Sequence, residues 1–311
     1  MKTIQIPGLD RGVSQLIMGS DYFNLRNTEK VHEMLDAYFE VGGNTIDTAH
    51  IYSGGESEQA IGRWMAERGN RDQVVIFTKG AHHDSKGPRV TREAIDSDLA
   101  VSLERLRTDY IDLYALHRDN PEVPVGPIVE ALNRHIEKGT IRAVGGSNWT
   151  TRRLQEANEY AAAHGLTGFS FSSPNLSLAK ANEPFWAGCV SADEETLDWH
   201  EANRFPLLSW SSQARGFFTG RFGPEDRSNA DLVRVFYSDD NWERLRRAEQ
   251  LGKDKGLSTI QIALAYVLNQ PFPACALIGP QNTAELNSSV EGARVTLTPD
   301  EIRWLDLRDR G

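Results

Sequence analysis

Short apolar stretches of strand type alternate with amphipathic stretches of helix type along almost the whole chain, and this alternation constrains the fold more than any other feature. Strands that are apolar on both faces are typical of a parallel sheet covered by helices. Counting from Leu16, there are eight strand–helix units, and eight units in 311 residues fit a closed (β/α)₈ TIM barrel better than two open sheets. No linker or internal repeat interrupts the series, so we expect a single domain over residues 1–311.

The individual elements are predicted from hydrophobic period, capping residues and turn residues. An N-terminal β-hairpin is expected from residues 2–6 and 13–17, leading into a first strand that ends at Gly19. The later strands are expected at residues 45–46, 74–80, 111–116, 141–144, 169–171, 206–210 and 274–278. Helices are expected at 28–41 with Thr28 as its cap, from 56 onward, and at 91–106, 125–138, 150–164, 194–203, 241–255, 258–268 and 298–307. Residues 211–240 are predicted to form a polar insertion, and residues 278–289 a loop after the last strand.

Composition excludes several classes of protein. The net charge is −10 and no run of Lys or Arg occurs, which argues against a nucleic-acid-binding or anionic-membrane surface. Two distant cysteines, Cys189 and Cys275, indicate no disulfide framework and fit a reducing compartment. The first ten residues lack the apolar segment of a signal peptide, and no run reaches membrane-spanning length, so we expect a cytoplasmic protein.

Polar residues follow three consecutive predicted strands. Asp47, Lys79 and His117 come just after the second, third and fourth strands, and Tyr52 lies in the loop after the second. A lone lysine or histidine at a strand end is usually structural. An acid, a base and an imidazole on three consecutive strands are less often a coincidence, because the carboxyl ends of barrel strands share one mouth where active sites are built.

The chemistry of these four residues can be worked out from their pKa values. A free tyrosine titrates at about 10, a nearby ammonium lowers the pKa of an acid by roughly 1–3 units, and burial raises the pKa of a phenol. We therefore expect Lys79 to acidify Tyr52, and Asp47 to keep Lys79 charged by pairing with it. His117 would hold a substrate oxygen beside the phenol, which then acts as general acid toward a carbonyl or general base toward an alcohol.

Two other kinds of site are considered and rejected. The chain shows no paired carboxylates of the glycosidase type. The run His82-His83-Asp84 contains possible metal ligands, but adjacent ligands on a loop are more often solvated, so no metal site is expected.

The opening hairpin and four further segments together resemble the aldo-keto reductase family, in particular a bacterial-type branch with a short C-terminus that is similar to potassium-channel β-subunits. The four segments are residues 44–62 (NTIDTAHIYSGGESEQAIG), 74–80 (VVIFTKG), 102–118 (SLERLRTDYIDLYALHR) and 141–149 (IRAVGGSNW). The resemblance covers nearly the whole chain. It implies an NAD(P)H-dependent carbonyl reductase, or alcohol dehydrogenase, on a (β/α)₈ barrel.

The resemblance also implies a role for each of the four residues. Tyr52 would be the proton donor, Lys79 its activator, Asp47 the partner of the lysine, and His117 the residue that orients the carbonyl. These are the same four residues that the strand ends single out.

Cofactor contacts are implied by the same resemblance. Ser147 and Asn148 would bind the carboxamide of nicotinamide, and Trp210 would stack on the ring. Ser211, Gln213 and Arg221 would line the pyrophosphate, and Ser173 stands where the family usually has glutamine. The remaining cofactor residues are expected after the first and last strands, at Ser20, Gly279, Gln281, Glu285 and Ser289.

The loop after the last strand bears on the choice between NADP and NAD. Relatives that select NADP carry Lys or Arg there, whereas this chain has Gln281, and Glu285 could bind free ribose hydroxyls. The family favours NADP(H), while this loop indicates NAD(H) or the use of both.

The substrate is bounded in size and class rather than identified. The mouth is expected to be framed by Asp21, Tyr22, His82, Arg118, Trp149 and the long loop after Trp210, and we expect no long C-terminal loop of the kind that closes the pocket in many relatives. We expect activity on small aldehydes, including aromatic and sugar-like ones. Two alternatives are a non-catalytic nicotinamide-nucleotide-binding regulatory subunit and a metal-assisted barrel hydrolase; the intact group of four argues against the first, and the lack of further ligands at strand ends against the second.

Overall fold

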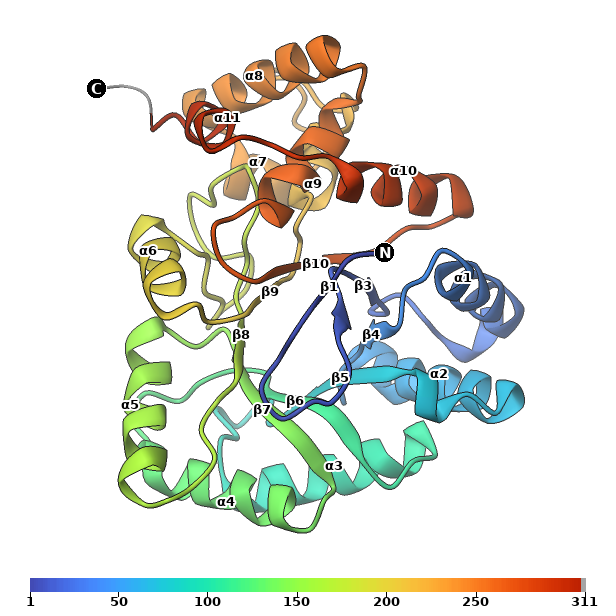
Figure 1. Ribbon diagram of the computed structural model, residues 1–311, viewed down its shortest axis with the longest axis vertical. Coiled ribbons are helices and arrows are strands. Elements are labelled where there is room, and N and C mark those ends of the chain that lie inside the picture. The colour runs from blue at the N-terminus through green and yellow to red at the C-terminus, as the bar shows by residue number, and fades with distance from the viewer. Residues whose placement is uncertain (309–311) are drawn as a thin grey trace.

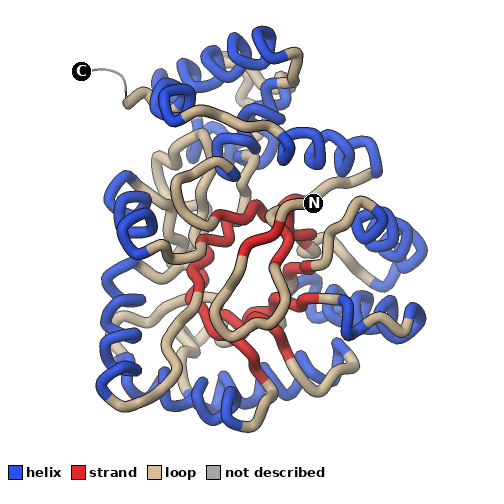
Figure 2. Tube along the Cα trace, viewed as in Figure 1, coloured by secondary structure: helices blue, strands red, loops and turns tan. Residues whose placement is uncertain are grey.

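The computed structural model describes residues 1–308, in which eight parallel strands close into a barrel (Figure 1). Around the barrel the strands follow the order β10-β3-β4-β5-β6-β7-β8-β9, so the last strand pairs with the first of the eight. Figure 2 shows the strands as an inner ring with the helices outside it. The predicted (β/α)₈ TIM barrel is confirmed. The barrel strands are β3 (Leu16–Gly19), β4 (Thr45–Asp47), β5 (Val75–Gly80), β6 (Ile111–Leu116), β7 (Ile141–Ser147), β8 (Phe171–Ser173), β9 (Leu207–Ser209) and β10 (Ala274–Ile278).

Most helices lie between consecutive strands on the outside of the barrel, and a smaller group packs beyond them. α8 packs against α9, and α11 packs against α8, at the top of Figure 1. The helices are α1 (Thr28–Glu40), α2 (Glu56–Arg68), α3 (Arg92–Leu106), α4 (Val125–Glu137), α5 (Thr151–Ala163), α6 (Glu194–Asn203), α7 (Ala230–Phe236), α8 (Asp239–Lys255), α9 (Thr259–Leu268), α10 (Thr283–Arg294) and α11 (Pro299–Leu305).

Alternation of side chains along the strands creates two hydrophobic cores. In β5, Val75 and Phe77 point into the barrel, where the Phe77 and Phe171 rings meet edge to face at 5.4 Å. Ile76, between them, belongs to the larger core that the strands share with the surrounding helices. Both faces of each strand are therefore buried, which is why the strands read as continuous apolar runs.

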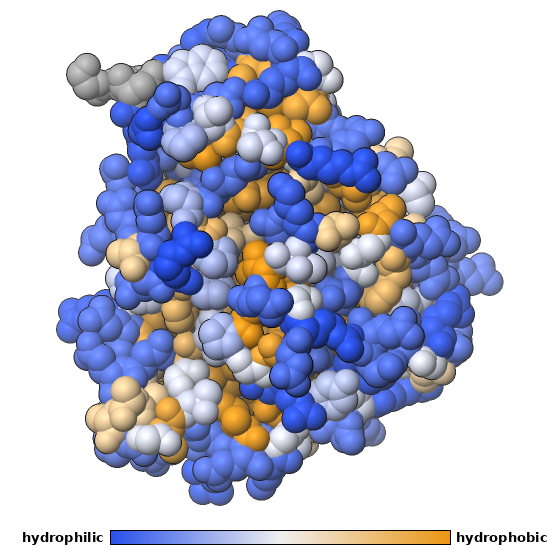
Figure 3. Space-filling model, viewed as in Figure 1, coloured by the Kyte–Doolittle hydropathy of each residue, from blue (hydrophilic) through white to orange (hydrophobic). Residues whose placement is uncertain are grey.

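The expected N-terminal hairpin is present and lies across one end of the barrel (Figure 1). β1 (Thr3–Ile4) pairs antiparallel with β2 (Val13–Ser14), and the side chains of Ile6 and Val13 join the core inside the barrel. Figure 3 shows this face with polar side chains over most of its surface and apolar ones in the gaps between them. The hairpin closes the end at which the strands begin, and leaves open the end at which they finish.

Several element boundaries differ from the sequence prediction. Asn27, rather than Thr28, precedes α1 as its cap residue, because a short 3-10 helix runs directly into it. Residues 211–240 contain a helix, α7, which Asn229 caps through the backbone N–H of Leu232. The strand expected at 169–171 begins only at Phe171.

The largest difference lies after the last strand, where a loop is predicted and α10 is found instead. The side chain of Asn282 accepts a hydrogen bond from the backbone N–H of Glu285, which starts the helix. Consequently Glu285 and Ser289 lie on a helix rather than a loop. Within residues 1–308, no helix is both long enough and apolar enough to cross a membrane.

Candidate active site

Strand geometry brings Asp47, Lys79 and His117 to the same mouth of the barrel. Side chains two residues apart on a strand share a face. Lys79 therefore follows Val75 and Phe77 on the inward face of β5, and His117 continues the inward row of Leu113 and Ala115. Asp47 is the last residue of β4, and its strand neighbour is Phe77. Lys79 and His117 thus continue the apolar rows of the interior at the point where their strands end, and Asp47 lies beside the row of β5.

Lys79 is the centre of the cluster and is only 2% exposed. Its ammonium forms an ion pair with the carboxylate of Asp47 and donates to the backbone oxygen of Thr48 at 2.9 Å. The hydroxyl of Tyr52 lies 3.2 Å from the same nitrogen. The amine also lies 4.6 Å from the centre of the Phe77 ring, a cation–π contact. A buried ammonium is thus held by one carboxylate and two neutral oxygens.

Directly after Tyr52 the chain makes a left-handed turn that leads into α2. Ser53, Gly54 and Gly55 have φ angles of 49°, 64° and 96°. Gly55 is favoured because residues with a side chain rarely adopt this φ, and a Cβ atom there would also displace the guanidinium of Arg105. α2 begins directly after this turn, and Glu56 and Glu58 in its first turn suit the positive end of the helix dipole.

The sequence predicts that Lys79 lowers the pKa of Tyr52, but the net shift of this pKa in the structure is upward. Burial raises the pKa of Tyr52 well above 10, and the carboxylates of Asp47 and Asp21 raise it further. Burial also lowers the pKa of Lys79. As the pH rises, Lys79 therefore loses its positive charge before Tyr52 loses its proton. The phenol therefore carries its proton at neutral pH, which is the form that can donate to a carbonyl oxygen.

Asp47 and Lys79 are each disfavoured as ions by burial and favoured by their pairing. Burial raises the pKa of Asp47 to about 6, against the opposing effect of Lys79. At pH 7 the carboxylate is therefore ionised, and it favours the charged form of Lys79.

His117 presents a neutral imidazole next to Tyr52. Burial lowers its pKa well below 6.5, and the positive charges of Lys79 and Arg118 lower it further. Its ring centre lies 5.7 Å from that of Tyr52, and its Nδ1 has no hydrogen-bond partner among the described residues. The backbone oxygen of His117 accepts hydrogen bonds from the side chains of Arg118 and Asn148. A neutral imidazole fixed in this way can hold a substrate oxygen by hydrogen bonding.

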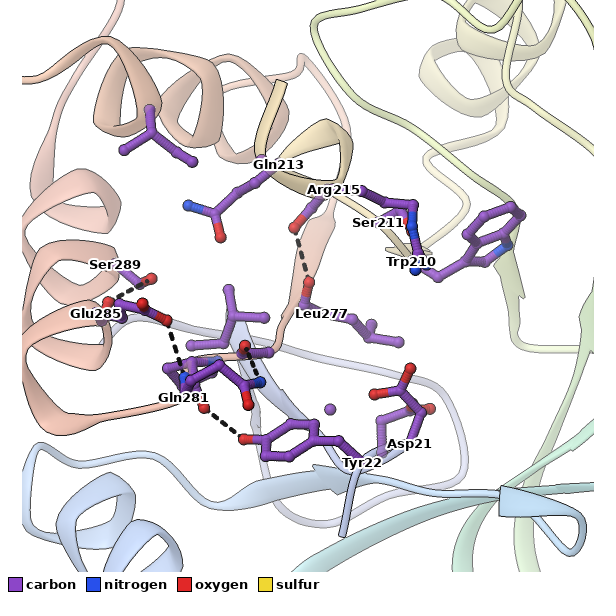
Figure 4. A pocket seen from close by; sticks show the side chains of 18 of the residues that line it. Asp21, Tyr22, Trp210, Ser211, Gln213, Arg215, Leu277, Gln281, Glu285 and Ser289 are labelled. Carbon is purple, nitrogen blue, oxygen red and sulfur yellow. Dashed lines mark hydrogen bonds between the residues drawn. The ribbon is translucent and has the colours of Figure 1, made fainter. Parts of the chain in front are cut away.

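The four residues open into one elongated cavity of about 1410 Å³. Figure 4 shows its far part, with Trp210 on one side and Glu285 and Ser289 of α10 on the other. Nearly all of the residues predicted for cofactor or substrate line this cavity: Ser20, Asp21, Tyr22, His82, Arg118, Ser147, Asn148, Trp210, Ser211, Gln213, Arg221, Gly279, Gln281, Glu285 and Ser289.

Two predicted residues do not reach the cavity. Trp149 is 2% exposed, packs edge to face on Phe169 at 5.0 Å, and donates its indole N–H to the backbone oxygen of Arg118. It belongs to the outer core because the chain has already turned toward α5 at this point. Ser173 is fully buried at the end of β8, and its backbone oxygen accepts from the Ser147 hydroxyl at 3.2 Å. The hydroxyl of Ser173 itself has no partner among the described residues.

The far part of the cavity combines several features that favour anions. Ser258 and Thr259 at the start of α9, and Gln281 just before α10, place two helix N-termini at its wall. After β9 the chain runs through left-handed residues at Ser211 and from 214 to 216, a backbone form that turns peptide N–H groups toward a shared concavity. These features suit the phosphate groups of a dinucleotide.

Sequence analysis missed several residues that line the cavity. Trp186 and Cys189 come from the connection after β8, Arg215 from the turn after β9, and Lys253 from α8. None of them lies at a strand end, so the spacing rule that found the other residues could not find these. Of the four, only Arg215 lies in a segment, residues 210–222, that already contained predicted contacts.

No group of three or more His, Cys, Asp or Glu side chains is arranged to hold a metal ion in the described part of the chain.

Comparison with known proteins gives a consistent result. A sequence model of the aldo/keto reductase family matches residues 15–307. The aldo-keto reductase YhdN of Bacillus subtilis is 30% identical over 281 residues, which cover 86% of this chain and 80% of the relative. A norsolorinic acid reductase of Aspergillus flavus is 29% identical over 88% of this chain and 70% of its own length. A putative aryl-alcohol dehydrogenase of Saccharomyces cerevisiae, AAD14, is 27% identical over 94% and 82%.

Solved structures agree on the fold. The glycerol dehydrogenase AKR11B4 from Gluconobacter oxydans superposes with a TM-score of 0.78 at 24% identity, covering 98% of this chain and 94% of the other. The thermostable aldo-keto reductase Tm1743 gives a TM-score of 0.75 with 99% of both chains covered. The chain therefore belongs to the aldo/keto reductase family of oxidoreductases.

Proposed function

We propose that this protein is an NAD(P)(H)-dependent oxidoreductase that interconverts aldehydes or ketones and alcohols, with Tyr52 as the general acid and base. The observation that carries the proposal is the position of the Tyr52 hydroxyl. It lies 3.2 Å from the buried amine of Lys79, beside the neutral imidazole of His117, in a cavity of about 1410 Å³. A phenol with these neighbours can give a proton to an oxygen held in front of it.

The residues present fit a nicotinamide dinucleotide. Trp210 offers an aromatic face at the end of the cavity nearest the four catalytic residues, and its indole N–H donates to the Asn148 side chain at 3.2 Å. The two helix N-termini and the left-handed turn after β9 offer N–H groups for the pyrophosphate. When bound, the nicotinamide would supply the hydride for the carbonyl carbon.

Each proposed cofactor contact follows from this arrangement. We assign the nicotinamide end to Ser147, Asn148 and Trp210, and the pyrophosphate to Ser211, Gln213 and Arg221. The adenosine end is assigned to Gln281, Glu285 and Ser289, with Ser20 and Gly279 closing the wall beside them. Ser173 stands behind Ser147 and supports it through its backbone oxygen rather than touching the cavity.

The reaction step requires little from the protein beyond position and charge. Tyr52 would donate its proton to the carbonyl oxygen, and the ammonium of Lys79 would stabilise the phenolate that remains. Asp47 would keep Lys79 charged, and His117 would hold the same carbonyl oxygen by a hydrogen bond. In the reverse direction the phenolate takes the proton of an alcohol.

The cofactor preference is proposed to include NADH. Around the N-terminus of α10, the carboxylate of Glu285 accepts from the backbone N–H of Gln281 at 2.9 Å, so a ribose 2′-phosphate would meet a negative charge there. Lys253 of α8 is a cation on the same cavity that could offset this repulsion. Measuring kcat/KM with NADH and NADPH, for the protein and for Lys253→Met, separates the two effects. An advantage of about a hundredfold for NADPH would contradict the proposal.

Substitution of the phenol tests the function itself. Tyr52→Phe should lower turnover by about 10²–10⁴-fold, the usual contribution of a positioned general acid. Nucleotide binding, followed by quenching of Trp210 fluorescence, should remain. The matched control is Tyr160→Phe, because the Tyr160 hydroxyl bonds Glu130 on the outer surface. If the unaltered protein binds nucleotide but turns over no aldehyde, ketone or ketosugar at millimolar concentration, the alternative of a regulatory nucleotide-binding subunit would hold.

The proposed substrates are small aldehydes, and aromatic ones in particular. Two relatives are named for the reduction of norsolorinic acid and the dehydrogenation of aryl alcohols. The catalytic part of this cavity carries the aromatic side chains of Trp186 and Trp210, whose ring centres are 6.1 Å apart. A flat ring would find apolar contact there.

A further inference from the structure

Within the part of the chain that the structure describes, Arg118 is the buried arginine that forms no ion pair with a carboxylate. Four arginines of residues 1–308 are less than 10% exposed. Arg153 pairs with Asp119 at 2.9 Å, Arg247 with Glu243 at 2.9 Å, and Arg244 with Asp306 at 3.7 Å. Arg118, 8% exposed, forms no ion pair with any described residue.

Its guanidinium is anchored only by backbone oxygens. Nη1 donates to the oxygen of His117 at 2.8 Å, and Nε donates to the oxygen of Ala187 at 3.3 Å. Nη2 donates to no described acceptor. The two anchors fix the orientation of the planar group and leave one edge available.

Arg118 lines the catalytic cavity and follows His117 directly in the chain. Its positive charge helps to lower the pKa of His117 and of Lys79, and it opposes the rise in the pKa of Tyr52, so it lies within electrostatic reach of all three. A ligand that meets His117 and Tyr52 therefore comes close to Arg118.

A buried cation without a counter-ion is costly, and an incoming anion recovers that cost. Guanidinium groups bind carboxylates through paired N–H donors, and bonds of this kind are about twice as strong as neutral ones. Asp21 also faces the cavity and is exposed, and its carboxylate acts on Tyr52 and Lys79 in the opposite sense to Arg118. The preference for a negative group is thus local to the Arg118 guanidinium, which forms no ion pair with a described carboxylate.

We propose that Arg118 binds a carboxylate of the substrate, so that the preferred substrates are carbonyl compounds that also carry a carboxylate, such as carboxylated aromatic aldehydes. This inference rests on the proposed carbonyl reductase function and adds the charge of the substrate to it. Arg118 sets specificity, whereas Tyr52 and Lys79 carry out the proton transfer.

The test compares two aldehydes of the same size and different charge, 4-carboxybenzaldehyde and 4-formylbenzamide. The unaltered protein should show a kcat/KM at least about tenfold higher for the carboxylate, because one charge-assisted contact is gained. In Arg118→Met the ratio of the two kcat/KM values should fall to near one, and in Arg118→Lys it should be intermediate. Arg152→Met, which removes an exposed arginine on α5 that pairs with Glu156, is the control and should keep the ratio.

The outcomes separate the inference from the function on which it rests. Reduction of both aldehydes with equal efficiency would overturn the carboxylate preference and leave the reductase intact. A loss of activity that is equal for both substrates in Arg118→Met would also overturn it, because that pattern indicates a structural role.

Failure to reduce either aldehyde with NADH or NADPH would count against the reductase function instead. In that case the inference is tested by titration calorimetry with terephthalate and with terephthalamide in the presence of nucleotide. This binding measurement uses the unaltered protein and needs no turnover. Tighter binding of terephthalate by about tenfold supports it, and equal binding overturns it.

Discussion

Replacement of Lys79 by methionine tests whether the buried ammonium stabilises the negative charge that develops on Tyr52. Methionine fills a similar volume but carries no charge, so the Asp47 carboxylate and the Tyr52 phenol both lose their cationic neighbour. The pKa of Asp47, already raised to about 6 by burial, rises further, and the carboxyl becomes neutral near pH 7. The variant therefore removes the charge next to the phenol without leaving a buried carboxylate in its place.

The size of the effect follows from the 3.2 Å distance between the Lys79 amine and the Tyr52 oxygen. At an effective dielectric constant of about 20, two unit charges at this distance attract by about 5 kcal/mol. If about half of the negative charge has developed on the phenol oxygen in the transition state, Lys79→Met loses about 2–3 kcal/mol, which is about 30- to 160-fold in kcat. Loss of the ammonium also raises the pKa of the phenol, so alcohol oxidation should require a higher pH by at least about one unit.

The assay is steady-state kinetics in both directions between pH 6 and 10, with the aldehyde that is reduced best and its alcohol. Lys86→Met is the matched control, because this lysine is exposed on the connection between β5 and α3. A Lys79→Met variant that folds, binds nucleotide and keeps kcat within threefold in both directions would refute the role of the ammonium.

Three further predictions follow from groups around the barrel. The kcat of carbonyl reduction should change less than about twofold between pH 7 and 9, because the pKa of Tyr52 lies well above 10. Below about pH 6 this kcat should fall as Asp47 takes up a proton. A fall in kcat between pH 7 and 9 would contradict this prediction. His200 is fully buried and its pKa is lowered to about 4, so the unfolded chain binds its proton first and the free energy of unfolding should drop by about 2–3 kcal/mol between pH 7 and 4.5. His200→Gln should lack that drop in urea titrations, and an equal drop in both proteins would exclude His200 as its source. Gly62→Ala should lower the free energy of unfolding by about 2 kcal/mol, because the new Cβ would lie 2.2 Å from the backbone oxygen of Arg105. The control Gly223→Ala should not change the stability, because its Cβ would meet nothing within 4 Å. Equal midpoints of thermal unfolding for the two variants would show that α2 can move away from Arg105.

Much of the fold could be predicted because the relevant signals are local. Buried strands such as Ile111–Leu116 and Ala274–Ile278 read as continuous apolar runs, and their bounds agree with the prediction. α6 is bounded by an Asp193 cap and an Arg204 stop, and its span is also as predicted. α10 was harder to recognise, because its start depends on one asparagine side chain, Asn282, directly after a Pro-Gln turn.

Part of the candidate site could likewise be predicted from local signals, and part of it could not. Asp47, Lys79 and His117 follow from the rule that alternate residues of a strand share a face, and from the shared mouth of a closed barrel. Trp149 also follows a strand, yet it turns outward and packs on Phe169, since its direction is set by packing rather than by spacing. Lys253 reaches the cavity from a helix that no local pattern connects with the barrel mouth.

The sequence by itself determined the eight-unit barrel, the hairpin and the identity of the four candidate catalytic residues, because hydrophobic period and strand ends are encoded over a few residues. Only the tertiary structure decided the charge state of those residues and the surroundings of Arg118. Burial and the distance to each neighbouring charge depend on contacts between residues far apart in the chain. The phenol keeps its proton, and the buried guanidinium of Arg118 has no carboxylate partner within residues 1–308, because of which side chains the closed barrel brings together.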